Sequence, residues 1–255
     1  MVALLTGCGG SPTPSGDPGG AEPSEAAAAP RCMPTGDAAE IFFEGADGTT
    51  LAAIEAGVGT IGVVLVHGSG NAGRCVWTRE IPTLTEAGFH ILAIDHACVG
   101  VSGCPDDKDL VADIDAAAAE LRRLGADVVA VIGASAGTAE TIVAGAHADL
   151  DAVVALSPLR LDAAVTLTPP ASVDAAAGTI RVPTLLVVGT DDRNASVDAV
   201  TALSKVIPEG LATLLVVDGG GHAQELLYPE GATADSTPGG PTYDAVLAFL
   251  HEHLG

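Results

Sequence analysis

Residues 127–137 read DVVAVIGASAG, and this stretch decides the fold class. Residues 128–132 form an uninterrupted apolar run, which predicts a buried strand, and the residues that follow the glycines favour a helix. Between them lies Gly133-Ala134-Ser135-Ala136-Gly137, whose small residues let a tight strand-to-helix turn close. Such a turn holds a serine hydroxyl out of the fold, where a histidine can remove its proton. We therefore interpret Ser135 as a candidate nucleophile.

The pentapeptide alone is a weak signal, because glycine makes up 32 of the 255 residues. The alternative role for Ser135 is a helix N-cap, which serine often fills. The order of strands, acids and histidines along the rest of the chain has to decide between the two interpretations.

Short β-rich runs alternate with helical stretches, which predicts an α/β fold with a mostly parallel central sheet and helices on both faces. Residues 41–44 and 49–56, joined by Asp47-Gly48, predict an N-terminal antiparallel hairpin. Only about 25 residues separate Pro158 from Pro183, so we expect no cap domain and an open pocket. Further strands are expected at 61–66, 89–95, 127–132, 152–156, 184–188 and 212–217, and helices at 78–87, 110–124, 136–148, 196–206 and 243–253.

The N-terminal region divides the chain into three expected parts. Residues 1–8 end in Leu5-Thr6-Gly7-Cys8, which is similar to a bacterial lipobox and makes Cys8 a candidate lipidation site. No basic, apolar signal precedes it, so either the true start lies upstream of Met1 or the motif is accidental. Residues 9–37 have the Gly, Pro and Ala content of a disordered tether, and 38–255 form one folded domain. With an upstream start we expect an extracytoplasmic protein anchored by lipid to the bacterial cell membrane, and otherwise a cytoplasmic one.

Four cysteines follow Cys8, and two interpretations of them stay open. An even number fits two disulfides in an oxidising compartment, with Cys98–Cys104 as the favoured bridge and Cys32–Cys75 pinning the tether to the domain. Four buried free thiols fit the sequence equally well.

Charge and motif content exclude several functional classes. The net charge is −23 and only two residues are lysines, so we expect no nucleic-acid partner and no attraction to anionic lipids. No run of 18 apolar residues predicts a membrane span. The sequence has neither H-E-x-x-H nor paired C-x-x-C motifs, so we expect no metal and no other cofactor. The oligomeric state is left open.

The candidate base is His222. A nucleophile at the carboxyl end of a central strand needs its partners on loops at the same edge of the sheet. His222 stands in Gly219-Gly220-Gly221-His222 directly after the last expected strand, and its glycines give the backbone freedom to bring the imidazole to Ser135. Strand polarity removes most of the other histidines, because His90 lies at a strand start and His147, His251 and His253 lie within helices.

The candidate acid is Asp192, in the Gly189-Thr190-Asp191-Asp192 turn that follows the expected strand 184–188. Asp191 is expected to cap this turn or the helix after it. Asp218 is a weaker rival, because only four residues separate it from His222.

An oxyanion hole needs backbone N–H groups aimed at the negative charge that develops during acyl transfer. His67-Gly68-Ser69 follows the expected strand 61–66, and we assign the two donors to the N–H groups of Ser69 and Ala136. His67 is expected to brace this loop rather than to act as a base.

Across residues 40–255 the order of these motifs is similar to that of the α/β-hydrolase superfamily. The family's His-Gly oxyanion loop, elbow serine, acid and histidine are matched in order by His67-Gly68-Ser69, Ser135, Asp192 and His222. Its D-x-x-G-x-G-x-S stretch is matched only in part, by Asp95, Gly100 and Ser102, since Cys98 stands where that stretch usually has glycine.

The resemblance implies an esterase- or lipase-like serine hydrolase that cleaves carboxylic esters through an acyl-enzyme. Ser135, Asp192 and His222 would form its triad, and a small-molecule ester or a lipid would be its substrate. Trp77 would then line the acyl pocket, although a lone tryptophan in a helix is more often part of the core.

Two rival functions remain. Gly68, Gly70 and Gly73 form a G-x-G-x-x-G after a strand, and Asp95 closes the next strand, which is the pattern of a dinucleotide-binding protein. A catalytically silent lipoprotein that uses the same scaffold for binding also fits, because order alone does not prove a triad.

Overall fold

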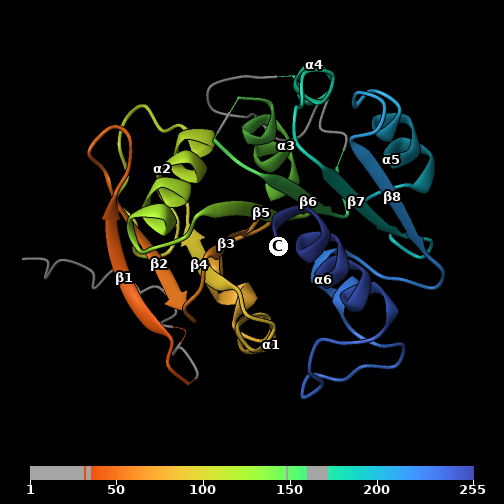
Figure 1. The fold of residues 1–255 in the computed structure, drawn as a ribbon, viewed down its shortest axis with the longest axis horizontal. Coiled ribbons are helices and arrows are strands. Elements are labelled where there is room, and N and C mark those ends of the chain that lie inside the picture. Colours follow the sequence, from red (N-terminus) through yellow and green to blue (C-terminus); the bar gives the residue numbers. More distant parts are fainter. Residues whose placement is uncertain (1–31, 33–35, 148, 160–171) are drawn as a thin grey trace, which may run out of the picture.

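The computed structural model describes residue 32 and residues 36–147, 149–159 and 172–255. Cys8 and most of the expected tether lie outside these residues. Eight strands form a single sheet in the order β1-β2-β4-β3-β5-β6-β7-β8 (Figure 1). The strands are β1 (Ala39–Glu44), β2 (Thr50–Ala56), β3 (Ile61–Val66), β4 (His90–Asp95), β5 (Val128–Ala134), β6 (Ala152–Leu156), β7 (Thr184–Gly189) and β8 (Ala212–Val217).

The sheet is mostly parallel. β1 pairs antiparallel with β2, and β2 pairs antiparallel with β4, whereas the pairs from β4 through β8 are all parallel. This arrangement confirms the predicted fold class and the N-terminal hairpin. Since the parallel strands all point the same way, the loops after β3, β5, β7 and β8 meet at one edge of the sheet.

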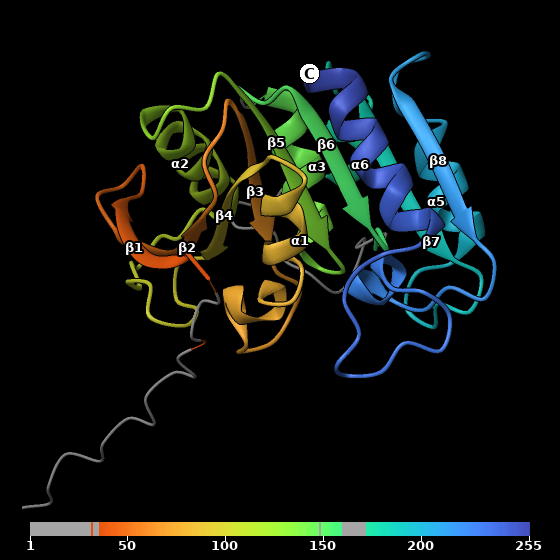
Figure 2. The same cartoon turned by 60° about the horizontal axis from the view of Figure 1, so that its bottom comes forward.

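Helices cover both faces of the sheet (Figures 1 and 2). α2 (Leu110–Arg123), α3 (Gly137–His147) and α5 (Val197–Ser204) pack on one face. α1 (Ile81–Glu86) and α6 (Pro241–Leu254) pack on the other. Two apolar clusters result, one on each face of the sheet.

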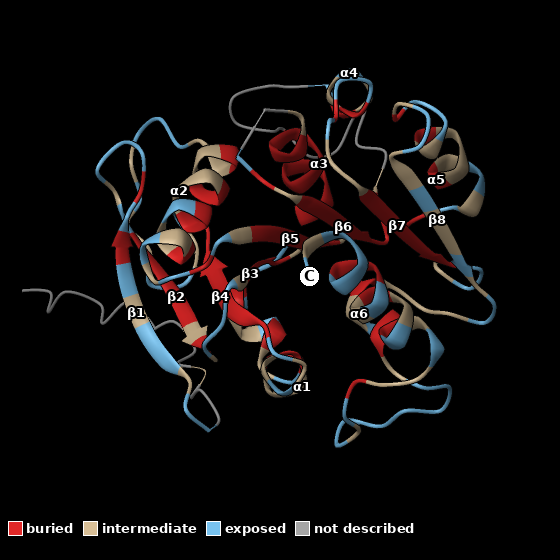
Figure 3. Cartoon of the chain, viewed as in Figure 1, coloured by how far each residue is buried: buried red, intermediate tan, exposed pale blue. Residues whose placement is uncertain are grey.

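Burial follows strand position. β4, β5, β6 and β7 are buried almost throughout, which is why their sequences are continuous apolar runs, whereas the edge strands β1 and β8 are partly exposed (Figure 3). Each large side chain buried in these strands stabilises the fold by about 1.5–3 kcal/mol. The rigid centre of the sheet thereby fixes where the loops of the site begin.

The predicted helix at 78–87 is wrong in extent. A short 3-10 helix, η1 (Gly73–Trp77), comes first, and α1 begins only at Ile81, with Pro82 in its first turn, where a missing N–H costs nothing. Trp77 is fully buried and belongs to the core. Two other short helices were not predicted, α4 (Val173–Ala177) and a 3-10 helix, η2 (Ala223–Leu227). They carry too few residues for a periodic pattern.

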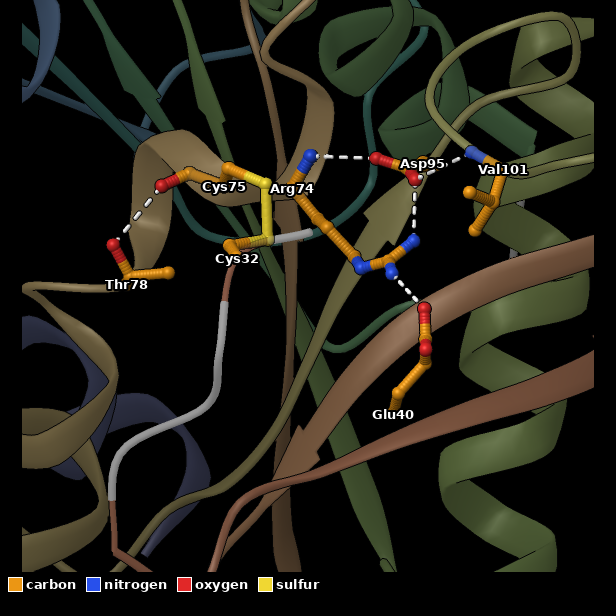
Figure 4. The surroundings of a disulfide bond; sticks show 7 residues. All are labelled: Cys32, Glu40, Arg74, Cys75, Thr78, Asp95 and Val101. Carbon is orange, nitrogen blue, oxygen red and sulfur yellow. Dashed lines mark hydrogen bonds and ion pairs between the residues drawn. A yellow bond between two sulfur atoms is a disulfide. The ribbon is translucent and has the colours of Figure 1, made fainter. Parts of the chain in front are cut away.

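Two disulfides join Cys32 to Cys75 and Cys98 to Cys104. The first fastens the start of the domain to η1, beside an ion-pair cluster in which the buried Arg74 meets the buried Asp95 and the exposed Glu40 (Figure 4). The two-disulfide interpretation of the cysteines therefore describes this structure. In the part of the chain that is described, no helix has both the length and the apolar content to cross a bilayer.

Candidate active site

Ser135 lies on the tight turn between β5 and α3, with a φ of +53°. Positive φ is costly for a residue with a Cβ, and such strain is found at functional sites. The flanking glycines are required by packing. A Cβ on Gly133 would lie 2.7 Å from the carbonyl oxygen of Gly137, and one on Gly137 would lie 2.9 Å from Val66 Cγ1 and closer still to the carbonyl oxygen of His67. The G-x-S-x-G pattern is thus explained by close backbone approach.

The three predicted triad side chains meet. His222 Nε2 is 2.8 Å from Ser135 Oγ, and His222 Nδ1 is 2.9 Å from each carboxylate oxygen of Asp192. With the tautomer assigned from these partners, Nδ1–H donates to Asp192 and Nε2 accepts from the Ser135 hydroxyl. The Ser135 side chain is therefore bonded to His222, which is not the arrangement of a helix N-cap.

The acid and base loops are held against each other by backbone hydrogen bonds. Thr190 N–H donates to Val217 at 2.9 Å, and Asp191 N–H donates to Gly220 at 3.1 Å. A Cβ on Gly189 would overlap the backbone of Gly220, so this close approach needs glycine. The glycine run before His222 therefore allows two loops to touch, in addition to the backbone freedom that the sequence suggested.

Asp192 stays ionised although its side chain is fully shielded from solvent. Burial raises the pKa of this carboxyl, but hydrogen bonds from the Ser157 side chain, from the N–H groups of Ala195 and Asn194, and from His222 outweigh burial and leave the pKa below its usual value. An ionised carboxylate is what can stabilise an imidazolium.

The prediction that Asp191 caps this turn is wrong. Asp192 Oδ1 accepts the N–H groups of Asn194 and Ala195, at 2.8 and 2.9 Å, and Ser196 caps α5. One carboxylate thus both closes the turn and contacts His222, because it is the residue whose side chain points inward. Asp218, the weaker rival, accepts only from Thr190 Oγ1 among the contacts described, at 3.4 Å.

Ser157, which follows β6 directly, was not predicted from the sequence. It is fully buried with a φ of +56°, and its Oγ accepts the N–H of Ala223, the residue after His222, at 2.7 Å. The same side chain lies close enough to Asp192 to help lower the pKa of that carboxyl. Ser157 therefore contacts both partner loops. Its place at the carboxyl end of a strand between the serine and acid strands was a usable signal.

The proposed oxyanion donors lie on one cavity of about 200 Å³, lined by Ser69, Ala136 and neighbouring residues. In the described part of the chain, neither N–H donates to a protein acceptor. Ala136 directly precedes α3, where the first N–H groups of a helix are free and the helix dipole favours negative charge. Gly68 packs against the serine, since a Cβ there would lie 3.1 Å from Ser135 Cβ.

His67 braces this loop. Its Nδ1 lies 2.7 Å from the carbonyl oxygen of Gly68, and its Nε2 accepts the N–H of His96 at 3.4 Å. Burial and the neighbouring His96 lower the pKa of His67 to about 4. A neutral imidazole with both nitrogens engaged is a structural group, as the sequence analysis expected.

Cys98 marks the departure from the D-x-x-G-x-G-x-S stretch. Its φ is +67°, a conformation usually taken by glycine, and the disulfide to Cys104 closes the loop around it. Ser102 Oγ donates to the carbonyl of Asp95 at 2.7 Å and accepts the N–H of Ala52 at 2.9 Å. The loop is thus tied to the sheet in spite of the substitution.

The geometry does not support a dinucleotide site. Gly73 opens a five-residue 3-10 helix, too short to bind a pyrophosphate at its N-terminus. The Asp95 carboxylate, which would have to bind a ribose, is 2% exposed and is engaged by the Arg74 guanidinium and backbone N–H. Among the described residues no cluster of His, Cys, Asp or Glu could hold a metal ion.

A larger cavity of about 480 Å³ lies behind the His222 loop, between η1 and residues 217–234. None of the triad residues lines it. None of the triad residues lines the smaller cavity either, but Ser69 and Ala136, the residues with the predicted oxyanion donors, do line it. The expectation of an uncapped pocket depends on residues 160–171, which lie outside the described residues.

Comparisons with known proteins agree with this architecture. Residues 62–181 match the family model described as the alpha/beta hydrolase fold. No curated protein sequence matches the chain. Among solved structures, the esterase Pf2001 of Pyrococcus furiosus is similar with a TM-score of 0.70 and 19% identity, over 86% of this chain and 93% of that one.

Two further structures show the same fold. A membrane phospholipase A, described as a bacterial virulence factor, has a TM-score of 0.66 at 15% identity, over 84% of this chain and 86% of that one. Est1E from Butyrivibrio proteoclasticus, solved with ferulic acid bound, has a TM-score of 0.62 at 18% identity, over 84% and 98%. At these identities the likeness concerns the fold alone. Together with the family model matched over residues 62–181, it shows that the chain has the alpha/beta hydrolase fold.

Proposed function

We propose that the protein is a serine hydrolase that cleaves carboxylic esters through an acyl-enzyme intermediate. The observation that carries the proposal is the continuous hydrogen-bonded chain from Ser135 Oγ through His222 to Asp192, with distances of 2.8 and 2.9 Å. Nucleophile, base and orienting acid at hydrogen-bond distance are the signature of an activated serine. A catalytically silent scaffold has no need of all three.

In the acylation step, Ser135 Oγ attacks the ester carbonyl carbon while His222 Nε2 takes the hydroxyl proton. The tetrahedral oxyanion accepts hydrogen bonds from the N–H groups of Ser69 and Ala136. Asp192 stabilises the imidazolium without taking its proton. The intermediate collapses, the C–O bond to the alcohol breaks, and His222 gives its proton to the leaving alkoxide.

In the deacylation step, water attacks the acyl-enzyme carbonyl and His222 again takes the proton. The same two N–H groups stabilise the second oxyanion, and collapse returns the proton to Ser135 Oγ and frees the carboxylic acid. The products are one acid and one alcohol, and no cofactor takes part in the proposed reaction.

The ester preference is supported by the neighbours in fold, two of which are described as an esterase and a phospholipase. Thioesters, polyesters and amides are less favoured substrates. We also propose that the protein works outside the cytoplasm, because two disulfides persist in oxidising compartments. Lipidation at Cys8 would anchor residues 38–255 through the tether at 9–37, and the mass of the protein isolated from its native membranes would test it.

A fluorophosphonate probe tests the function. We expect labelling of the native protein and of Ser204→Ala, whose hydroxyl only bonds to Thr201 within α5, and no labelling of Ser135→Ala. Asp192→Asn should lower kcat by about 10³- to 10⁴-fold, because the imidazole loses its orienting charge. Labelling that persists in Ser135→Ala, or hydrolysis of amides in strict preference to esters, would overturn the proposal.

A further inference from the structure

The cavity beside the proposed oxyanion donors contains buried polar groups that the proposed mechanism does not use. Its wall is formed by the loop after β3, by residues 96–99 after β4 and by the first turn of α3. His96 and Glu140 line it, and they are only 3% and 4% exposed. Polar side-chain atoms that are buried in this way usually have a hydrogen-bond partner.

Each of these two side chains has one buried atom without a partner in the described part of the protein, His96 Nε2 and Glu140 Oε2. These two atoms do not bond to each other. An unpaired polar atom in a core costs about 1–3 kcal/mol. Two such atoms at one cavity indicate a ligand group that forms the missing hydrogen bond to each of them.

The protonation of the pair defines the chemistry of that group. Burial raises the pKa of Glu140, so its carboxyl is a hydrogen-bond donor over more of the pH range than an exposed one. His96 Nδ1 lies 3.1 Å from Asp113 Oδ2, which also accepts the N–H of Ala97 at 2.8 Å. With Nδ1–H donating to Asp113, Nε2 is an acceptor. A hydroxyl group both donates and accepts, so one hydroxyl can bond to Glu140 Oε2 and to His96 Nε2.

The position of the cavity assigns it to the acyl side of the substrate. The leaving alcohol has to lie within hydrogen-bond reach of His222 Nε2, but no residue of the His222 loop lines this cavity. Ser135 does not line the cavity either, but its neighbour Ala136 and Ser69, whose N–H groups would hold the carbonyl oxygen, are part of the wall. Its volume of about 200 Å³ has room for roughly six or seven water-sized groups. A short acyl chain fills it.

We propose that this cavity is an acyl-binding subsite that selects short hydroxyacyl esters, with the acyl hydroxyl bound between Glu140 and His96. The inference rests on the proposed ester hydrolysis at Ser135. A site whose buried polar groups bond a substrate hydroxyl rejects the analogue that lacks it, because those groups are then left unpaired. A carboxylate is a poorer fit, since the acceptor His96 Nε2 and a chain charge of −23 both oppose an anion, although the exposed Lys108 stands at the rim.

The test compares p-nitrophenyl 3-hydroxybutyrate with p-nitrophenyl 3-methylbutyrate, in which a methyl replaces the hydroxyl, and with p-nitrophenyl hemisuccinate. For the native protein we expect kcat/KM to be at least tenfold higher for the hydroxy ester than for either of the others. In Glu140→Met the preference over the methyl ester should fall to about unity, whereas Glu140→Gln, which keeps a donor, should retain part of it. The ratio is measured on one preparation, so a reduced folded fraction cancels.

Glu80→Gln is the matched control, because Glu80 is likewise buried and has a raised pKa but lines the other cavity. It should leave the ratio unchanged. Equal kcat/KM values for the hydroxy and methyl esters in the native protein, a preference for hemisuccinate, or a ratio that Glu140→Met does not alter would each overturn the subsite. If ester hydrolysis is present while the ratio is flat, the subsite alone is wrong and water completes the pair. If Ser135 is not labelled and no ester is hydrolysed, the proposed function itself is wrong.

Discussion

Gly137→Ala is the substitution that most directly tests how the turn at Ser135 is built. Gly137 follows Ala136, whose N–H is one of the proposed oxyanion donors. A methyl at Gly137 would stand 2.9 Å from Val66 Cγ1 and 3.1 Å from the His67 carbonyl carbon, and still closer to the His67 carbonyl oxygen. Ordinary contact begins near 3.4 Å, so β3 and α3 have to separate by about 0.5 Å at Val66 and by more at the carbonyl.

The size of the effect follows from that displacement. Overpacking of this kind costs about 1–3 kcal/mol of the free energy of unfolding. Both oxyanion donors sit on the two segments that are forced apart, and a misplacement of about 1 Å can cost 10²-fold in rate. We therefore expect kcat/KM on a p-nitrophenyl ester to fall by about 10- to 100-fold, with the loss in kcat, since the oxyanion exists only during the reaction.

Gly239→Ala is the control, because a Cβ at Gly239 meets nothing within 4 Å. Its backbone hydrogen bond to Leu227, at 2.8 Å, is unaffected by alanine. Steady-state kinetics and thermal unfolding of the two variants give the comparison. A Gly137→Ala protein whose kcat/KM lies within threefold of the Gly239→Ala protein would refute the argument that close packing of the turn positions the donors.

Three further outcomes can be measured. Ser157→Ala should lower kcat about tenfold with little change in KM. It should also lower the free energy of unfolding by about 1–3 kcal/mol, because the N–H of Ala223 is left buried and unpaired. An unchanged kcat would exclude a positioning role for Ser157. Removing the Cys32–Cys75 bridge, whose cysteines are 43 residues apart, should lower the free energy of unfolding by about 4 kcal/mol in a loop-closure model, and removing Cys98–Cys104, with a separation of 6, by about 2 kcal/mol. Denaturant unfolding of the paired Cys→Ser variants measures both losses, and a larger loss for Cys98–Cys104 would contradict the model. Burial raises the folded-state pKa of Glu140 above 4.5, so the folded chain holds this proton more tightly, and its stability should fall as the pH rises from about 4.5 through the folded pKa. The stability of Glu140→Gln relative to the native protein should therefore increase over that range. A constant difference would show that the pKa is not raised.

The fold could be predicted from the sequence because its signals are local. Continuous apolar runs mark buried parallel strands, and Asp47-Gly48 between two β-rich runs marks the hairpin. The order of Ser135, Asp192 and His222 after successive strands was equally accessible, since parallel strands deliver their loops to one edge. The distances between these side chains could not be predicted from the sequence, because they depend on contacts between loops far apart in sequence.

The features of the site that could not be predicted from the sequence depend on tertiary contacts. Asp191 and Asp192 are chemically identical neighbours, and only the folded loop shows that the Asp192 carboxylate is the one that turns toward His222. Ser157 has no motif of its own, and its role comes from Ala223, 66 residues away. Glu140 looks like an ordinary charge in the first turn of a helix, and only the folded structure shows that it is buried and that burial raises the pKa of its carboxyl.

The two sides of the site are stabilised by different kinds of interaction. Substitutions that affect the base His222 are therefore expected to differ from those that affect the oxyanion loop. On the base side, hydrogen bonds join Asp192, Ser157 and the loops at Gly189 and Gly220, so a change there alters the imidazole and hence the rate for every substrate. On the other side, the Cys98–Cys104 bridge closes the loop that carries His96 into the proposed acyl subsite. A change in that loop leaves the contact between Ser135 and His222 in place and acts on the wall that meets the acyl chain. We therefore expect substitutions in the Cys98–Cys104 loop to change the proposed acyl selectivity and substitutions near Asp192 to change the rate for every ester.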